Sequence, residues 1–264
     1  QRRAVSELMR VAPVADDLGR RFEAAGHHLA LVGGSVRDAL LGRLGNDLDF
    51  TTDARPDDIK ACLEGWADAI WTQGERFGTI GAKFRGRTYE ITTFRAESYT
   101  DDSRKPHVTY ADDVEVDLGR RDFTVNAMAI EVTGDTPTLV DPHGGAADLM
   151  TKQLRTPLGP EISFSDDPLR MLRAARFIAG YDLQPSDDLI AAVTAMAPRL
   201  EIVSAERLRD EFDKLITVDH PSAGLFFLHD TGLSDQFLPE LSAMRLEHDP
   251  IHRHKDVFAH TIAV

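Results

Sequence analysis

Cysteine is almost missing from this sequence of 264 residues, which contains only Cys62. A single cysteine excludes an intramolecular disulfide framework and is typical of a reducing compartment, so we expect a cytoplasmic protein. Long apolar runs are missing too: no stretch of about 18 apolar residues occurs, which excludes a transmembrane helix. The first residues lack the basic, apolar and small-residue order of a signal peptide. The remaining composition, 42% hydrophobic and 28% charged, is that of a soluble globular protein.

Basic residues are in the minority, with 30 Lys and Arg against 44 Asp and Glu and a formal net charge of −14. This balance disfavours indiscriminate adhesion to nucleic acid, although a local basic face still permits RNA binding. No obligatory protein partner is implied.

The chain begins without Met and ends within a helical pattern, so we expect it to be part of a longer protein.

Strand patterns and helix patterns occupy different parts of the chain. Apolar runs and alternating patterns predict strands as far as residue 140, and after residue 144 only helical patterns remain. Strands followed by helices favour an α+β head and an all-α body. We therefore expect a catalytic head (1–143), a helical neck (144–217) and a helical body that leads into a further domain (218–264).

The patterns predict individual elements as well. In the head we expect strands at 28–32, 47–51, 70–72, 78–84, 88–95, 127–132 and 138–140. We expect head helices at 6–25 (bent or interrupted at Pro13), 36–41 and 56–64, and a long loop over 97–118. After the head we expect helices near 145–151, 167–179, 186–197, 204–217, 220–230 and 252–264. Arg85-Gly86-Arg87 joins two of the strands as a hairpin.

A pair of glycines, Gly33 and Gly34, separates the first predicted strand from a short helix. Because side chains are missing there, the N–H groups at the helix start can bind a triphosphate. We include Arg37, which follows closely, among the nucleotide-binding residues. Taken alone, the same pattern is also that of an ordinary surface turn.

Two aspartates alternate along the next predicted strand. Asp47 and Asp49 point to one side, while Leu48 and Phe50 point into the core, because side chains alternate along a strand. Two carboxylates about 7 Å apart repel each other unless a cation lies between them. Mg²⁺ prefers such oxygen ligands and holds substrate phosphates at the same time. We expect Glu90, on a neighbouring strand, to supply a third catalytic carboxylate.

Three motifs, in order, resemble those of the class II CCA-adding tRNA nucleotidyltransferases and bacterial poly(A) polymerases, members of the polymerase-β-like nucleotidyltransferase superfamily. They are GGxVRDxLLG…DxDFTT from Gly33, RRDFTxNAMA from Arg120 and DPxGGxxDL from Asp141. The resemblance covers residues 30–215 and implies the mixed-sheet head of that superfamily, followed by an all-α neck and body. It also implies template-independent addition of CMP and AMP to the 3′ end of tRNA. The nucleotides would come from CTP and ATP, with two Mg²⁺ ions assisting and pyrophosphate released.

The second motif carries further roles in the family. Arg121 suits phosphate oxygens, and Asp122 and Asn126 suit ribose hydroxyls. Asp122 and Asn126 are four residues apart and fall on one face if a helical turn begins there. The resemblance therefore implies that these three residues bind the nucleotide.

A base-selecting pair is implied by the family's EDxxR motif, which Asp166 to Arg170 match with Asp in place of the first Glu. Acidic residues and Pro168 suit the first turn of a helix, on which Asp167 and Arg170 are neighbours. A carboxylate beside a forked donor fits the Watson–Crick edges of cytosine and adenine. Uracil and guanine would place a carbonyl oxygen against that carboxylate. Arg173, on the same face, is expected to assist.

Two later stretches have mainly structural interpretations. Ser204 and Arg207 resemble part of the family's fifth motif, and we expect them to cap and brace the helix on which the base-selecting pair rests. The histidine-rich run from Glu247 to Thr261 resembles the opening of an HD-type domain. The paired His and Asp of such a domain would lie beyond residue 264, so we assign no metal to this run.

The motifs leave several functions open. A poly(A) polymerase of the same family carries them too, although a strongly basic C-terminal region is missing here. Enzymes that add only CC or only A also fit. A non-catalytic RNA-binding module is disfavoured by the intact Asp47, Asp49 and Arg121. An HD phosphohydrolase with this region as an accessory part would depend on residues beyond the sequence.

Overall fold

A computed structural model of the chain describes residues 2–98, 107–111 and 113–244. The chain divides into two compact units, Gln1–Ala147 and Asp148–Val264. The histidine-rich run and the helix predicted at 252–264 lie outside the described residues. No helix among the described residues is both long enough and apolar enough to cross a membrane.

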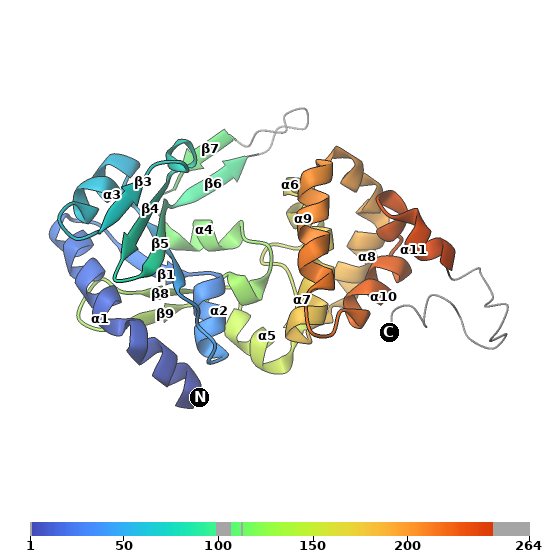
Figure 1. Cartoon of the computed structure of the whole chain (residues 1–264), viewed down its shortest axis with the longest axis horizontal. Helices are drawn as coiled ribbons and strands as arrows, with labels where there is room; N and C mark the ends of the chain where they lie inside the picture. The colour runs from blue at the N-terminus through green and yellow to red at the C-terminus, as the bar shows by residue number, and fades with distance from the viewer. Residues whose placement is uncertain (1, 99–106, 112, 245–264) are drawn as a thin grey trace. The chain divides into compact units, whose positions relative to one another are not determined.

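A seven-stranded mixed sheet lies at the centre of the first unit (Figure 1). Its strands are β1 (Leu29–Val32), β2 (Asp47–Thr52), β3 (Ala69–Trp71), β4 (Thr79–Phe84), β5 (Arg87–Thr93), β8 (Ala129–Glu131) and β9 (Thr138–Val140). The spatial order is β3-β4-β5-β2-β1-β8-β9; β2 and β5 run parallel, and the other neighbours are antiparallel. These strands confirm the predicted ones to within two residues at each end.

Helices cover the sheet and close its core. They are α1 (Arg2–Ala24), which continues through Pro13, α2 (Gly34–Leu40) and α3 (Pro56–Leu63), with the 3₁₀ turns η1 (Glu75–Phe77) and η2 (Thr124–Asn126). Leu48 and Phe50 of β2 are each 1% exposed and pack in the main core with residues of α1 and α3, as predicted. Val32 packs on the opposite face of the sheet with Leu118 and Ala127. Protein therefore covers one face of the sheet with the main core and part of the other face with this smaller cluster.

The segment 97–118, predicted as a long loop, contains regular structure. β6 (Arg95–Ser98) pairs antiparallel with β7 (His107–Tyr110), and the helix α4 (Val114–Gly119) follows. The loop prediction is wrong for residues 107–110 and 114–118, whose short elements show no apolar period in the sequence; residues 99–106 and 112 lie outside the described residues. Asp113 caps α4 by accepting the Glu115 N–H at 2.8 Å, and Asp117 of this helix is completely buried.

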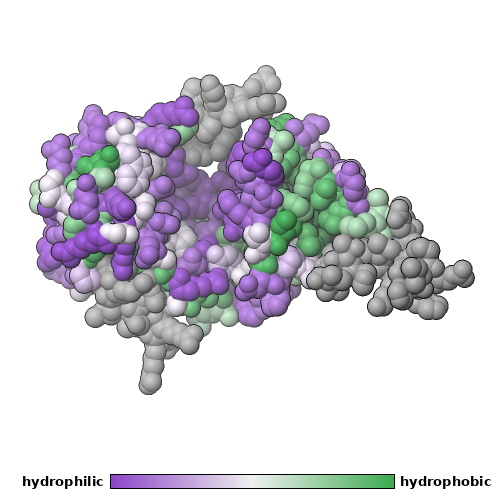
Figure 2. Space-filling view, in the orientation of Figure 1, coloured by the Kyte–Doolittle hydropathy of each residue, from purple (hydrophilic) through white to green (hydrophobic). Residues whose placement is uncertain are grey.

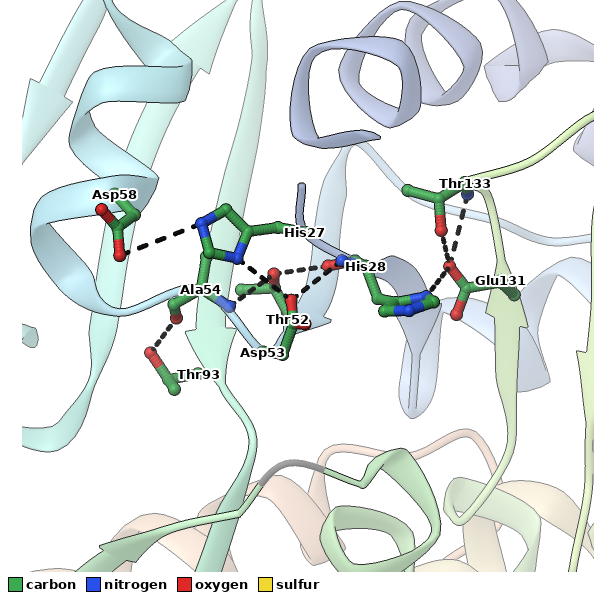
Figure 3. A network of polar contacts seen from close by, with 9 residues as sticks. All are labelled: His27, His28, Thr52, Asp53, Ala54, Asp58, Thr93, Glu131 and Thr133. Atoms are coloured by element: carbon green, nitrogen blue, oxygen red, sulfur yellow. Dashed lines mark hydrogen bonds and ion pairs between the residues drawn. The ribbon is translucent and has the colours of Figure 1, made fainter. Parts of the chain in front are cut away.

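A network of polar contacts holds the last residues of β2 and the turn into α3 (Figure 3). The His28 N–H donates to Asp53 Oδ1 at 2.8 Å, and His27 Nδ1 lies 3.4 Å from the same oxygen. The Thr52 hydroxyl donates to the His28 carbonyl oxygen. These contacts fix the C-terminal end of β2, whereas Asp47 stands at its beginning.

The second unit is mainly helical. It contains α6 (Pro160–Asp166), α7 (Leu169–Tyr181), α8 (Asp187–Met196), α9 (Ala205–Ile216), α10 (Ser222–Asp230), α11 (Pro239–Ala243), η3 (Ala197–Ile202) and η4 (Ser234–Gln236); α5 (Gly145–Thr151) spans the division. α7 packs against α9 and α10, and Gly224 permits close approach because a Cβ there would lie 2.4 Å from the Ala175 carbonyl oxygen. Figure 2 shows hydrophobic residues gathered on part of this unit's visible face.

The predicted helices between residues 145 and 230 are confirmed, but the expectation of helices alone is wrong in one respect. β10 (Gln153–Leu154) and β11 (Gln184–Pro185) form a short parallel pair. Two-residue strands are too short to show an alternating pattern. The helix α6 was also not predicted; it is seven residues long and follows Gly159, whose φ is 106°.

Candidate active site

Three acidic side chains project from neighbouring strands of the first unit. Asp47 and Asp49 lie on the face of β2 opposite to Leu48, and both are exposed. The parallel pairing of β2 with β5 places Glu90 directly opposite Asp49 in register. The structure therefore brings together Asp49 and Glu90, which are far apart in the sequence, on one face of the sheet.

Like charges act on Asp49. Although its side chain is accessible, surrounding protein displaces water and raises the pKa of Asp49 above its ordinary value. The carboxylates of Glu90 and Asp47 raise this pKa further, while the guanidinium groups of Arg121 and Arg37 lower it. A cation held by these carboxylates would relieve the repulsion.

The donor set fits Mg²⁺ bound together with a substrate. Carboxylate oxygens are the ligands that Mg²⁺ prefers, usually one or two from the protein with substrate phosphates and water completing the shell. Within the described residues no three His, Cys, Asp or Glu side chains form a group placed to hold a metal ion. Asp47 and Asp49 would thus need phosphate oxygens to complete the coordination.

Ser35 fixes the strand that carries the aspartates. Its Oγ accepts the Asp49 N–H at 3.0 Å, and its side chain is 5% exposed. Because Ser35 lies in the first turn of α2, this bond ties the glycine turn to β2. Sequence reasoning missed Ser35, and its only signal is a hydroxyl residue directly after the two glycines.

The glycine pair leaves room for two guanidinium groups. Gly33 has φ 68° and ψ −130°, a conformation that favours glycine, and a Cβ there would lie 2.6 Å from Arg121 Nη1. A Cβ on Gly34 would lie 3.4 Å from Arg37 Nη2. The turn therefore places Arg121 against the entry to α2, while the Gly33 N–H itself donates to the Met128 carbonyl oxygen at 3.1 Å.

A buried hydrogen-bond network joins the first and second motifs. Arg37, 6% exposed, donates from Nε and Nη2 to the two carboxylate oxygens of Asp38, both at 2.9 Å, and from Nη1 to Asn126 Oδ1. Asn126 Nδ2 in turn donates to Asp122 Oδ1 at 2.9 Å. Asp122 and Asn126 thus meet as predicted, although the turn between them is the 3₁₀ helix η2. Arg37 braces this network from within the protein.

Arg121 is held by a carboxylate that sequence reasoning missed, in the segment predicted as a loop. Asp117 is 0% exposed, and its Oδ2 accepts from Arg121 Nη2 at 3.0 Å. Its Oδ1 accepts from Arg120 Nη2 at 3.0 Å and from the Arg95 N–H at 3.3 Å. Burial raises the pKa of Asp117, but the two guanidinium groups outweigh burial and hold the pKa below its ordinary value.

The third motif begins α5 against the second motif. Asp141 accepts from the N–H groups of Gly145 at 2.7 Å and Ala146 at 3.0 Å, so it caps the helix. A Cβ on Gly145 would lie 2.0 Å from the Thr124 carbonyl oxygen. Only glycine permits this approach, which explains the glycine of the motif in physical terms.

In the second unit, Asp167 lies between two helices. It follows α6 in an extended conformation, and α7 begins at Leu169, two residues later than predicted, so Asp167 lies just before the helix that it was expected to open. Asp167 Oδ1 accepts the Leu169 N–H at 3.2 Å, and Oδ2 accepts from Arg207 Nη2 at 2.8 Å. Ser204 caps α9 by accepting the Arg207 N–H at 3.5 Å. The predicted brace is confirmed by the contact of Arg207 with Asp167, but the predicted cap is misplaced, because Ser204 caps α9 and not α7.

The side chains of Arg170 and Arg173 contact other residues of the second unit. Arg170 is 9% exposed, and its Nη1 donates to Ser163 Oγ at 3.0 Å. Arg173 Nη1 lies 3.9 Å from Glu211 Oε2, and Glu211 is 2% exposed. The backbone N–H of Arg170 donates to the Asp167 carbonyl oxygen at 3.0 Å, so the two predicted base-selecting residues are neighbours with separately fixed side chains.

Two known families match separate parts of the chain. Residues 29–155 match the family described as "Poly A polymerase head domain". Residues 182–244 match the family described as "Probable RNA and SrmB- binding site of polymerase A".

Individual proteins match over most of the chain. The CCA-adding enzyme of Levilactobacillus brevis is 39% identical over 227 residues, which are 86% of this chain and 55% of that enzyme. The CCA-adding enzyme of Streptococcus gordonii is 37% identical over 241 residues, 91% of this chain and 57% of that enzyme. The chain thus spans a little over half the length of these relatives.

Solved structures share the fold. The Bacillus stearothermophilus CCA-adding enzyme in complex with CTP aligns with a TM-score of 0.77 and 32% identity, over 90% of this chain and 56% of that one. The Thermotoga maritima CCA-adding enzyme complexed with tRNA aligns with a TM-score of 0.72 and 27% identity, over 86% of this chain and 52% of that one.

Proposed function

Because this chain belongs to the nucleotidyltransferase family of the CCA-adding enzymes and bacterial poly(A) polymerases, we propose that it adds CMP and AMP to the 3′ end of tRNA without a template. CTP and ATP are the donors, and pyrophosphate is released. The observation that carries the proposal is the cluster of carboxylates formed by Asp47, Asp49 and Glu90. The positive charge of the Arg121 guanidinium also acts on the Asp49 carboxylate. Such a set can bind a divalent cation and a triphosphate together.

The first unit carries the triphosphate and the reacting groups in this proposal. Asp47 and Asp49 would hold Mg²⁺, and Glu90 would assist them from β5. Two Mg²⁺ ions bound there would supply activation of the attacking 3′-hydroxyl and neutralisation of the leaving pyrophosphate. Arg121 donates to phosphate oxygens beside the glycine turn, and positioning with charge neutralisation supplies most of the rate.

The network of the second motif positions the sugar. Asp122 and Asn126 offer an acceptor and a donor to ribose hydroxyls. Their orientation is supported by the hydrogen bond between them and by the contact of Arg37 with Asn126. Arg37 acts on the nucleotide through Asn126, as a brace.

Base selection belongs to the second unit in this proposal. Asp167 accepts the amino group of cytosine or adenine, and Arg170 donates to the ring acceptors beside it. The contacts of Arg207 with Asp167 and of Ser163 with Arg170 support a fixed geometry for both groups. Arg173 assists on the same helix. Uracil and guanine are rejected because each leaves a carbonyl oxygen facing a carboxylate.

The decisive experiment supplies the purified protein and Mg²⁺ with tRNA that lacks its CCA end. CTP and ATP are given separately and together, and products are resolved by length. Ordered addition of C, C and A that then stops is the expected result. Long A tails on generic RNA would identify a poly(A) polymerase instead, and addition of C alone or A alone would identify a partial enzyme.

A cytoplasmic location, where tRNA is matured in bacteria, accords with the free Cys62.

A further inference from the structure

Asp117 is the centre of a buried contact set that the known motifs do not explain. It is 0% exposed and lies on α4, one helical turn before Arg121. Both carboxylate oxygens are used: Oδ1 by Arg120 and by the Arg95 N–H, and Oδ2 by Arg121 Nη2. A buried carboxylate shared by two guanidinium groups restrains both of them.

Nη1 of the Arg121 guanidinium lies beside the glycine turn. Nη1 lies so close to Gly33 that a Cβ there would be 2.6 Å away. Nε is a buried donor that has no hydrogen-bond partner among the described residues. One end of the guanidinium is therefore anchored by Asp117, and Nη1 lies beside the glycine turn.

From these contacts we propose that Asp117 is a positioning residue for the triphosphate: it holds Arg121 by Nη2 so that Nη1, beside the glycine turn, is presented to phosphate oxygens. This inference rests on the proposed function. Asp117 itself is buried and touches no substrate. Its effect on nucleotide binding must pass through Arg121, which makes the two residues energetically coupled.

Substitution of Asp117 by Asn separates this role from simple support of the fold. An amide has one acceptor oxygen and one donor group in the same shape. The oxygen will stay on the side that receives two donors, from Arg120 and Arg95, and the NH₂ group will face Arg121. Asp117→Asn therefore removes the restraint on Arg121 while most of the packing remains.

The test is a double-mutant cycle with Arg121→Gln, in which calorimetry measures the dissociation constants of CTP and ATP with Mg²⁺. Asp117→Asn should weaken binding of both nucleotides by about 10- to 100-fold, the value of a hydrogen bond to a charged group. CTP and ATP should be affected equally, because the triphosphate is common to both. In the Arg121→Gln background the same change should have no further effect. Asp113→Ala is the matched control, since it removes the cap of the same helix without touching Arg121.

Each outcome decides a different point. Additive losses in the cycle, or an equal loss in Asp113→Ala, would show that Asp117 only supports the fold and would overturn the inference. Unchanged nucleotide affinity in Asp117→Asn, with normal binding by the parent protein, would also overturn it and leave the proposed function intact. A parent protein that binds neither nucleotide would overturn both. Thermal melting of every variant identifies losses that come from unfolding.

Discussion

Gly33→Ala should separate the conformational role of this glycine from its role as space for Arg121. Gly33 has φ 68°, and a Cβ there would lie 2.6 Å from Arg121 Nη1. The chain offers a matched control in Gly26→Ala. Gly26 has φ 81°, but a Cβ there would meet nothing within 4 Å. Both changes impose a positive φ on alanine, and only one of them displaces a guanidinium.

The expected magnitudes differ between stability and binding. A strained backbone conformation costs about 1–3 kcal/mol, so both variants should lose stability in that range. A loss of 1 kcal/mol lowers Tm by about 2–4 °C in a chain of this size. The close atom in Gly33→Ala is the end of the Arg121 side chain, whose Nη2 is bound by the buried Asp117, so its displacement adds a loss of stability that Gly26→Ala does not share. A displaced Arg121 loses a charge-assisted hydrogen bond to phosphate, worth about 1.5–3 kcal/mol or roughly 10- to 100-fold in affinity.

The assay measures Tm and the KM for CTP in both variants, at a temperature where each is folded. Gly33→Ala should raise KM by about 10- to 100-fold, whereas Gly26→Ala should leave it unchanged. Equal KM values in the two variants would refute the placement of Arg121 at the triphosphate. A raised KM in both would show that the loss follows from stability alone.

Three other changes test separate parts of the site. Asp49→Asn should abolish nucleotide addition in a tRNA extension assay. It should also raise the Tm of the metal-free protein at neutral pH, because the raised pKa of Asp49 means that the ionised form is disfavoured by folding. That gain should be absent below the ordinary pKa of 3.8 and should grow as the pH rises through the raised value; a gain that persists in acid would contradict it. Asp167→Asn should permit incorporation of UTP before it removes activity, and an unchanged C and A preference would refute base selection by this residue. Ser204→Ala should lower the free energy of unfolding by about 1 kcal/mol through loss of the cap, measured by urea denaturation.

Local patterns in the sequence were enough to predict most of the elements that build the candidate site. Alternation along β2 places Asp47 and Asp49 on one face and Leu48 in the core, because a strand has a period of two residues. The proximity of Asp122 and Asn126 followed from their spacing, although a 3₁₀ turn joins them. Such features depend on residues close in sequence, where backbone geometry alone sets the relation between side chains.

Contacts between distant segments were decided only by the tertiary structure. The parallel register of β2 and β5 sets Glu90 beside Asp49, and no local pattern specifies a register between paired residues that are 41 positions apart. Asp117 shows the limit most clearly, because a polar residue in an aperiodic segment became a buried partner of two arginines. A carboxylate can be buried only where its charge and hydrogen bonds are satisfied, and those partners are assembled by the fold.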